Sequence, residues 1–280
     1  MKVSYKNKSL QDNLTKLKSD TSIGFVPTMG ALHEGHLSLI KRAKAENKII
    51  VVSIFVNPTQ FDKKEDLSNY PRTIEKDLAL LKTVDCDIVF IPSAKEIYKN
   101  NISASHFNFD GLEFEMEGKH RKGHFDGVGT IVKRLFEIVK PDKAYFGEKD
   151  FQQLQIIKKL VEKHAISTQI VGCEIYRERD GLAMSSRNTR LTDIQRKEAP
   201  FIHKTLKSAK EKFKEKSISE VIKWVENEFE ENSVLNLEYF EIANIETLKS
   251  AKRKSKKSTY RGFIAVFADN IRLIDNIALN

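Results

Sequence analysis

Short apolar runs alternate with amphipathic stretches over the first two thirds of the chain. The apolar runs at 23–26, 48–56, 87–91, 143–146 and 169–175 read as strands, several of them apolar on both sides. The 3.6-residue spacing of apolar positions predicts helices that begin near Gly35, Thr73 (a candidate N-cap), Gly127 and Phe151. This alternation is typical of a parallel sheet with right-handed crossovers.

The pattern changes after a polar, glycine-bearing stretch at 177–188. Residues 193–230 read as two helices rich in lysine and glutamate, and the tail supplies three short strands near 235–242, 262–267 and 271–275. The sequence therefore predicts an α/β protein. We expect a Rossmann-like parallel sheet with helices on both faces over residues 1–178, and a smaller α+β C-terminal domain over residues 179–280.

Composition narrows the class of protein. Of 280 residues, 40% are hydrophobic and 31% charged, which is typical of a folded globular chain. The longest apolar run, 49–56, is too short to span a bilayer, and the first residues lack the apolar segment of a secretory signal. The two cysteines, Cys86 and Cys173, lie in strand-like runs and read as buried residues of a reducing compartment. We expect a cytoplasmic protein with no membrane partner.

The net charge of +9 is compatible with nucleic acid, but equally with a site for polyanionic small molecules. The basic run at 249–257 lacks the interleaved aromatic residues that stack on bases, so we interpret it as a solvated loop before a strand.

The stretch from Gly24 to His36, GFVPTMGALHEGH, places a glycine turn between a strand and a helix and adds two histidines at a spacing of three. The first N–H groups of a helix lack intrahelical partners and favour an anion. Imidazoles at that position add donors that can carry a proton at neutral pH. The alternative is an ordinary βα turn with a histidine facing the core. A zinc site is disfavoured, because no third ligand is near.

Three more polar segments are not explained by the core pattern: NPTQF at 57–61, GEKD at 147–150 and SSRN at 185–188. The first two follow predicted strands, and ligands of open α/β sheets bind outside the carboxyl ends of the strands. Lys149 and Arg187 suit phosphate oxygens, with Ser185 and Ser186 as added donors, and neutral amides suit a ligand with hydroxyls and a carboxylate. Asp150 reads either as a helix cap or as a group that helps to hold a cation.

This set of side chains contains no nucleophile–base pair, so it suits displacement at phosphorus, in which the protein positions reactants and spreads charge. No Walker sequence GxxxxGK[ST] is present, which makes cleavage between the α and β phosphates a natural alternative to γ transfer.

These segments together resemble the pantoate–β-alanine ligase (pantothenate synthetase) family, of the HxGH nucleotidyltransferase superfamily. The resemblance rests on PTMGALHEGH, VVSIFVNPTQF, YPRT, GHFDGV, GEKDFQQL and DGLAMSSRN, which cover most of residues 23–190, and on the closing IRLIDN. It implies that a pantoate carboxylate attacks the α-phosphate of Mg-ATP to give pantoyl adenylate and pyrophosphate. The amine of β-alanine then displaces AMP.

The resemblance also implies roles for individual residues. His36 would donate a proton, His33 would lie beside it on phosphate, and Lys149 would meet phosphates. Gln60 and Gln153 would hold pantoate, with Asn57 close by. The implied ATP-binding residues are Met29, Gly30, Ala31, Leu32, His33, Glu34, Gly35, His36, Gly147, Glu148, Lys149, Asp150, Tyr176 (largely through its backbone), Met184, Ser185, Ser186 and Arg187. ATP would be a substrate and Mg²⁺ its companion ion, with no direct protein ligand assigned to the metal.

The resemblance further implies a homodimer, no nucleic-acid partner, a nucleotide- and pantoate-binding first domain and a lid formed by the second. The loop around Arg121 matches a basic gate over the substrate, and we leave it outside the expected site. The alternatives are another HxGH nucleotidyltransferase or adenylating enzyme, against which NPTQF and GEKDFQQ argue, and a nucleic-acid-binding module that retains a vestigial site.

Overall fold

The computed structural model describes residues 1–17, 21–62, 64–99 and 101–280. The chain divides into two compact units, each with a hydrophobic core of its own. The first unit comprises Met1–Glu148 and Gln153–Glu174, and the second comprises Lys149–Gln152 and Ile175–Asn280.

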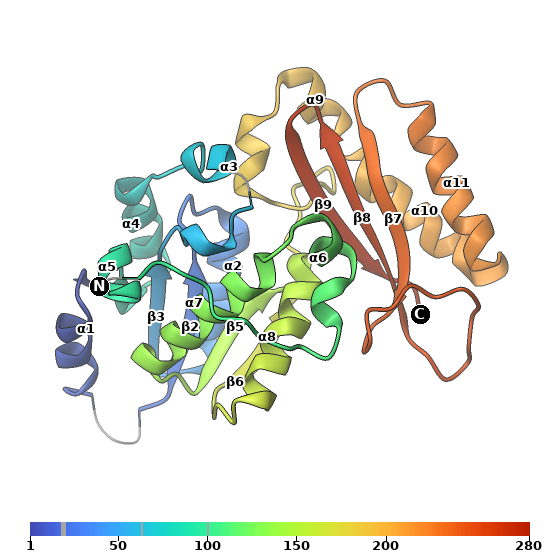
Figure 1. Cartoon of the computed structure of the whole chain (residues 1–280). Helices are drawn as coiled ribbons and strands as arrows, with labels where there is room; N and C mark the ends of the chain where they lie inside the picture. Colours follow the sequence, from blue (N-terminus) through green and yellow to red (C-terminus); the bar gives the residue numbers. More distant parts are fainter. Residues whose placement is uncertain (18–20, 63, 100) are drawn as a thin grey trace. The chain divides into compact units, whose positions relative to one another are not determined.

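A parallel sheet of six strands forms the centre of the first unit (Figure 1). Its strands are β1 (Lys2–Ser4), β2 (Ile23–Thr28), β3 (Ile49–Ile54), β4 (Ile88–Phe90), β5 (Lys143–Gly147) and β6 (Gln169–Cys173). They lie in the order β1-β4-β3-β2-β5-β6. The predicted parallel sheet is confirmed, and β1 is an additional edge strand that the apolar pattern does not predict.

The strand order changes direction at β2. From β2 the chain builds β3 and β4 on one side, and it later adds β5 and β6 on the other. In open α/β sheets, ligands bind at the carboxyl ends of the strands beside such a switch point. The turn after β2 and the residues after β5 follow the two strands that flank it.

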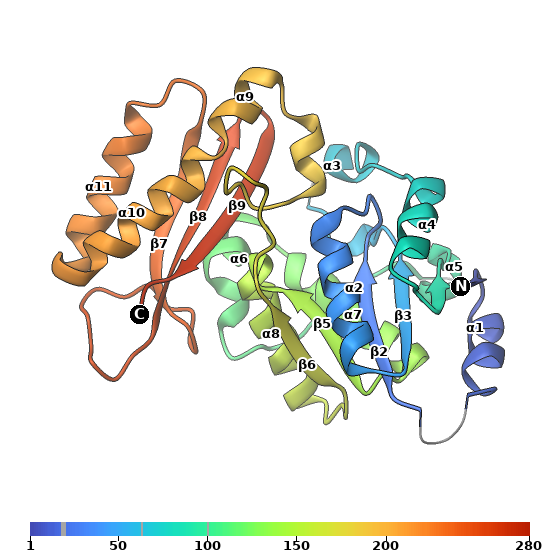
Figure 2. The same ribbon diagram turned by 180° about the vertical axis from the view of Figure 1, so that it is seen from behind.

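Helices lie on both faces of this sheet, with α7 in front of it in Figure 1 and α2 in front of it in Figure 2. The alternation of side chains along β2 explains the arrangement. Val26 packs in one core cluster with Leu37 and Ile40 of α2, whereas the neighbouring Phe25 makes an edge contact with Phe136 of α7.

The helices that belong wholly or mainly to this unit are α1 (Asn7–Leu14), α2 (Glu34–Glu46), α3 (Lys64–Ser68), α4 (Ile74–Thr83), α5 (Ala94–Tyr98), α6 (Met116–His120), α7 (His124–Val139) and α8 (Phe151–Lys163). Single 3₁₀ turns are η1 (Pro58–Gln60), η2 (Leu112–Phe114) and η3 (Glu148–Asp150). Thr73 stands at the N-cap of α4 as expected, but its side chain makes no capping bond and donates instead to Asp77 Oδ1 at 3.1 Å.

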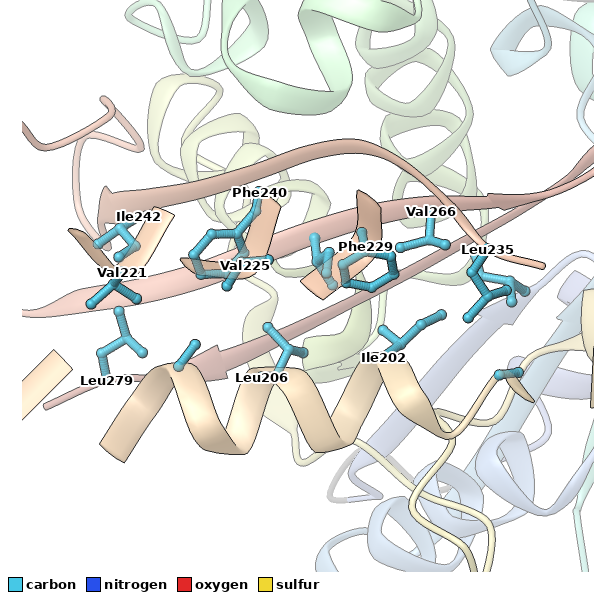
Figure 3. Close-up of a cluster of buried hydrophobic side chains, with 14 of the residues drawn as sticks. Ile202, Leu206, Val221, Val225, Phe229, Leu235, Phe240, Ile242, Val266 and Leu279 are labelled. Carbon is cyan, nitrogen blue, oxygen red and sulfur yellow. The ribbon is translucent and has the colours of Figure 1, made fainter. Parts of the chain in front are cut away.

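The second unit is an antiparallel sheet of three strands, β7 (Asn236–Asn244), β8 (Tyr260–Ala268) and β9 (Ile271–Ala278), with helices packed against it. Its helices are α9 (Asp193–Glu198), α10 (Phe201–Glu215) and α11 (Ile218–Glu230), and η4 (Ser186–Arg190) precedes them. Figure 3 shows Ile202 and Leu206 of α10 pointing toward strand residues such as Val266. The region 193–230 thus holds a short additional helix before the two that the pattern predicts.

The basic run at 249–257 lies in the connection between β7 and β8, as expected. Lys254 Nζ donates to the carbonyl oxygen of Phe213 and lies 4.3 Å from the centre of its ring. In the part of the chain that the structure describes, no helix is long and apolar enough to cross a bilayer.

Candidate active site

The turn after β2 owes its shape to two residues with positive φ and to one buried carboxylate. Gly30 has φ +84° and Ala31 has φ +50°, the left-handed region that favours glycine. Asp77 of α4, only 1% exposed, accepts the N–H of Ala31 at 3.0 Å and that of Leu32 at 2.8 Å. A Cβ on Gly30 would stand 3.0 Å from Asp77 Oδ2, so the glycine also makes room for the carboxylate.

The two histidines of this turn lie at the start of α2. His33 is the N-cap residue in an extended conformation, and its N–H donates to Nδ1 of His36 at 3.4 Å. The two ring centres are 4.1 Å apart, and both side chains are half-buried. A backbone N–H can only donate, so Nδ1 of His36 acts as an acceptor and a neutral His36 carries its proton on Nε2.

The segment after β3 brings three of the expected site residues together in the first unit. Asn57, 1% exposed, donates from Nδ2 to Gln60 Oε1 at 3.0 Å and to the carbonyl oxygen of Gly127 at 3.2 Å. Gln60 Nε2 in turn donates to Met29 Sδ at 3.2 Å. The NPTQF segment and the turn after β2 are therefore in direct contact, as the switch-point argument expects.

The backbone of Gln60 is held by two residues that the expected site leaves out. Its carbonyl oxygen lies 2.8 Å from Nδ1 of the buried His124 and accepts from Arg121 Nη2 at 3.4 Å. Arg121 also pairs with Asp62 at 3.7 Å and with Glu117 at 3.8 Å. The basic loop matched to a substrate gate is thus fastened to a residue of the expected substrate site.

The residues after β5 are divided between the units. Gly147, Glu148 and Gln153 belong to the first unit and are half-buried. Lys149 and Asp150 belong to the second, where the carbonyl oxygen of Lys149 accepts from Asn276 Nδ2 of β9 at 2.9 Å. Lys149 Nζ lies 3.7 Å from Asp150 Oδ1.

The loop from Tyr176 to Arg187 lies in the second unit and is tied to β9. Arg177 makes a two-pronged ion pair with the buried Asp275, at 2.6 and 3.0 Å. The N–H of Met184 donates to the carbonyl oxygen of Tyr176 at 3.0 Å, and Ser185 Oγ accepts the N–H of Arg187 at 3.2 Å. Met184, Ser185, Ser186 and Arg187 are half-buried, whereas the Tyr176 side chain is 42% exposed.

The residues fit a magnesium ion that arrives with a nucleotide. Among the described residues no three His, Cys, Asp or Glu side chains form a group that could hold a metal ion. Mg²⁺ bound with phosphates needs only one or two carboxylates and water. The Asp150 side chain is 47% exposed and offers a carboxylate of that kind.

Three residues that shape the site escape the sequence patterns. Asp77 lies 46 positions from Ala31, and His124 lies 64 positions from Gln60. Tyr98 lies 41 positions from Asn57, to whose Oδ1 its hydroxyl donates. Nothing in the spacing of polar residues signals these partners, because each contact forms only when separate crossover units pack together.

The family model described as "Pantoate-beta-alanine ligase" matches residues 2–278 of the chain. The chain is 56% identical over 282 residues to the pantothenate synthetase of Christiangramia forsetii, with 100% of both chains covered. It is 47% identical to the pantothenate synthetase of Bacteroides fragilis, with 99% of this chain and 98% of that protein covered.

Solved structures agree with these relatives. The pantothenate synthetase of Thermus thermophilus superposes with a TM-score of 0.92 at 37% identity, with 100% of this chain and 99% of that chain covered. A pantoate–β-alanine ligase from Francisella tularensis, complexed with β,γ ATP and β-alanine, gives a TM-score of 0.82 at 35% identity, with 100% and 98% covered.

Proposed function

This chain belongs to the pantoate–β-alanine ligase family and is an ATP-dependent ligase of pantoate and β-alanine, and we propose that it forms pantothenate through a pantoyl-adenylate intermediate. The observation that carries the proposal is the pair of imidazoles at the start of α2, beside the switch point of the sheet. Helix N–H groups and histidine donors at that position suit a phosphate group.

In the first step, a carboxylate oxygen of pantoate attacks the α-phosphorus of ATP. The new bond joins that oxygen to phosphorus, the bond from the α-phosphorus to the bridging oxygen breaks, and pyrophosphate leaves. Charge builds up on the phosphate oxygens as the bond breaks, so donors fixed around them lower the barrier. The Nε2 proton of His36 is of this kind, and we assign it to the departing pyrophosphate, with His33 beside it.

In the second step, the amine of β-alanine attacks the acyl carbon of the adenylate and AMP leaves with the pair of electrons from the acyl–oxygen bond. The amine gives up a proton to water as the amide forms. Gln60 and Gln153 hold pantoate in place for both steps, with Asn57 next to Gln60, because amides donate to hydroxyl and carboxylate oxygens and also accept.

The remaining residues of the proposed site bind the nucleotide. Lys149 meets phosphates as a mobile charge, and Arg187 offers a planar pair of donors. The proposed ATP-binding set is Met29, Gly30, Ala31, Leu32, His33, Glu34, Gly35, His36, Gly147, Glu148, Lys149, Asp150, Tyr176, Met184, Ser185, Ser186 and Arg187. With a bound nucleotide, Mg²⁺ neutralises phosphate charge, and Asp150 is the residue proposed to help hold it.

The roles of the two domains, the oligomeric state and the location of the protein are part of the same proposal. We assign nucleotide and pantoate binding to residues 1–178 and the role of a lid to residues 179–280. A homodimer in the cytoplasm, with small-molecule substrates and no nucleic-acid partner, agrees with the family resemblance.

One assay tests the function directly. We expect AMP release from Mg-ATP to require both pantoate and β-alanine, in amounts equal to the pantothenate formed. AMP release that needs only one of the two, or neither, would contradict the ligase assignment.

Two variants test the proposed catalytic residues. His36→Ala and Lys149→Ala each remove a group assigned to phosphate charge, so we expect kcat to fall by about a hundredfold or more while the circular dichroism spectrum stays unchanged. His164→Ala and Lys158→Ala make the same changes at exposed positions of or next to α8 and serve as matched controls. Normal turnover in His36→Ala or Lys149→Ala would remove that residue from the mechanism.

A further inference from the structure

A row of polar contacts inside the first unit links a buried tyrosine to the amide of Gln60. The hydroxyl of Tyr98, at the end of α5, donates to Asn57 Oδ1. Asn57 Nδ2 then donates to Gln60 Oε1 at 3.0 Å, and Gln60 Nε2 points to Met29 Sδ at 3.2 Å. Tyr98 and Asn57 are 3% and 1% exposed, so water does not compete for the bond between them.

The amide of Asn57 can adopt only one orientation in these surroundings. At one end Nδ2 faces the backbone carbonyl of Gly127 at 3.2 Å, and a carbonyl oxygen can only accept. At the other end Oδ1 faces the hydroxyl of Tyr98 and that of Thr59 at 3.2 Å. Turning the amide round would set an oxygen against the Gly127 oxygen, and it would take from the hydroxyls of Tyr98 and Thr59 the oxygen to which they donate.

The tyrosine itself is well placed to act as a fixed donor. Arg134 Cζ lies 4.5 Å above the centre of its ring, and Arg134 Nη1 holds the carbonyl oxygen of Ile97 at 2.7 Å. Burial raises the pKa of the Tyr98 phenol above its usual value, so the hydroxyl keeps its proton at neutral pH. Thr59 Oγ1, 2.9 Å from the same hydroxyl, completes the set.

We propose that Tyr98 is a positioning residue for the ligase: through Asn57 it fixes the Gln60 amide so that its NH₂ group, and not its oxygen, is presented to the substrate. The carboxylate and hydroxyl oxygens of pantoate accept hydrogen bonds, so a donor is the group they need. Tyr98 itself touches no substrate in this arrangement. The inference rests on the proposed role of Gln60 in holding pantoate.

The central experiment compares two variants in which phenylalanine replaces a buried tyrosine and so removes its hydroxyl group. Tyr98→Phe keeps the ring under Arg134 and removes only the hydroxyl. Tyr145→Phe makes the same change at a 0% exposed tyrosine of β5, whose hydroxyl bonds Asn47 Nδ2 at 2.7 Å and Glu46 Oε2 at 2.9 Å. Both variants lose buried hydrogen bonds, so both should be less stable.

Only Tyr98→Phe should change substrate binding. We expect its KM for pantoate to rise about five- to tenfold while its KM for ATP stays within twofold of the wild type. In Tyr145→Phe both constants should stay at the wild-type values. Equal KM values for pantoate in the two variants, or a parallel rise for ATP and pantoate, would overturn the proposal.

A Gln60→Ala background separates this inference from the function on which it rests. If Tyr98 acts through Gln60, then Tyr98→Phe adds no further rise in the KM for pantoate when Gln60 is already alanine. A full additive rise would overturn the positioning role. A Gln60→Ala enzyme with a normal KM for pantoate would instead contradict the proposed role of Gln60.

Thr59→Val provides a second test that does not depend on the folding of Tyr98→Phe. It removes the other hydroxyl at Asn57 Oδ1 and keeps a β-branched side chain of similar shape. We expect a rise of about twofold to fivefold in the KM for pantoate alone. A KM for pantoate equal to that of the wild type in this variant counts against the proposal.

Discussion

Asp77 is the acidic side chain on which the shape of the turn after β2 depends. Its two carboxylate oxygens accept from Ala31, Leu32 and the hydroxyl of Thr73. Hydrogen bonds to an ionised group are stronger than neutral ones, and the accepting carboxylate is only 1% exposed. The carboxylate therefore holds the backbone that leads into His33 and His36.

Asp77→Asn should loosen that turn. The substituted side chain has the same shape, but its NH₂ group must face the N–H of Ala31 in one orientation and the N–H of Leu32 in the other. We expect a loss of about 2 kcal/mol in the free energy of unfolding and a rise of about tenfold in the KM for ATP. Urea unfolding and steady-state kinetics measure the two effects.

Asp87→Asn is the matched control for this change. Asp87 accepts the N–H of Ile50 at 2.8 Å and pairs with Lys44 at 2.9 Å, at the opposite, amino-terminal end of the sheet. It should lose stability without a change in the KM for ATP. A similar rise in KM in both variants would show that general destabilisation, and not the turn, is responsible.

At this scale the sequence predicts the residues of local motifs and misses their long-range partners. The glycine turn, the two histidines and the NPTQF amides stand out because small or polar residues interrupt an apolar pattern at fixed positions. In the sequence, Asp77 is one of several charged residues in the helix predicted to begin near Thr73, and Tyr98 lies outside the predicted elements. Their roles come from packing between crossovers, which no local pattern encodes.

At the scale of elements, the close approach of α7 to η1 fixes the segment that carries Gln60. A Cβ added to Gly127 would lie 2.2 Å from the carbonyl oxygen of Thr59 and 2.6 Å from Cα of Gln60. Contacts this short to backbone atoms cannot be relieved by a side-chain rotation. The helix can reach η1 only because this position is glycine.

Gly127→Ala should therefore push the two elements apart. We expect a loss of about 1–3 kcal/mol in the free energy of unfolding, and a rise of about tenfold in the KM for pantoate because Gln60 moves with η1. Thermal unfolding and steady-state kinetics check both values.

Gly129→Ala in the same helix is the comparison. There the added Cβ would lie 3.0 Å from ring atoms of Phe107 and Phe109. These two residues are not among the expected site residues. An unchanged KM for pantoate is expected in this variant. If the two alanine variants have the same KM, the contact with η1 has no bearing on substrate binding.

Element boundaries explain part of what the pattern misses. The sequence predicts a helix from Gly127, whereas α7 begins at His124, so the buried first turn that holds the Gln60 carbonyl lies outside the prediction. β1 has only three residues, too few for any periodicity. Parallel strands such as β3 are predicted well, because burial on both faces gives an unbroken apolar run.

At the scale of the whole molecule, two histidines make the stability depend on pH in opposite directions, because the fold lowers the pKa of one and raises the pKa of the other. Burial, helped by the charges of Arg177 and Lys207, lowers the pKa of His203, and Asp275 opposes this only in part. Asp126 raises the pKa of His106 on the surface of the first unit, through a 3.0 Å contact. Each histidine belongs to a different unit.

The signs follow from proton uptake. The folded chain binds a proton at His203 more weakly than the unfolded chain does. The contribution of neutral His203 to stability is therefore complete above a pH of about 6.5 and is lost as the pH falls below that value. For His106 the folded chain binds the proton more tightly. Its contribution is present at low pH and is lost as the pH rises through its raised pKa.

We therefore expect His203→Gln to make the unfolding temperature less sensitive to acid between about pH 7 and 5. His106→Gln should make it more sensitive to acid in the range above about pH 6.5, where the folded and unfolded chains differ in the protonation of His106. Differential scanning fluorimetry on both sides of about pH 6.5 measures the two slopes. Slopes that change in the same direction in the two variants would contradict the assignment.

The two buried thiols can be used to measure how often the core of the first unit opens. Cys86 and Cys173 are 2% and 5% exposed, lie in the same core cluster and account for both cysteines of the chain. Burial raises the pKa of Cys86 to about 12 and also raises that of Cys173, so neither is an effective nucleophile while the sheet is intact. The rate at which an electrophilic dye labels the protein therefore measures how often the core cluster of the first unit opens.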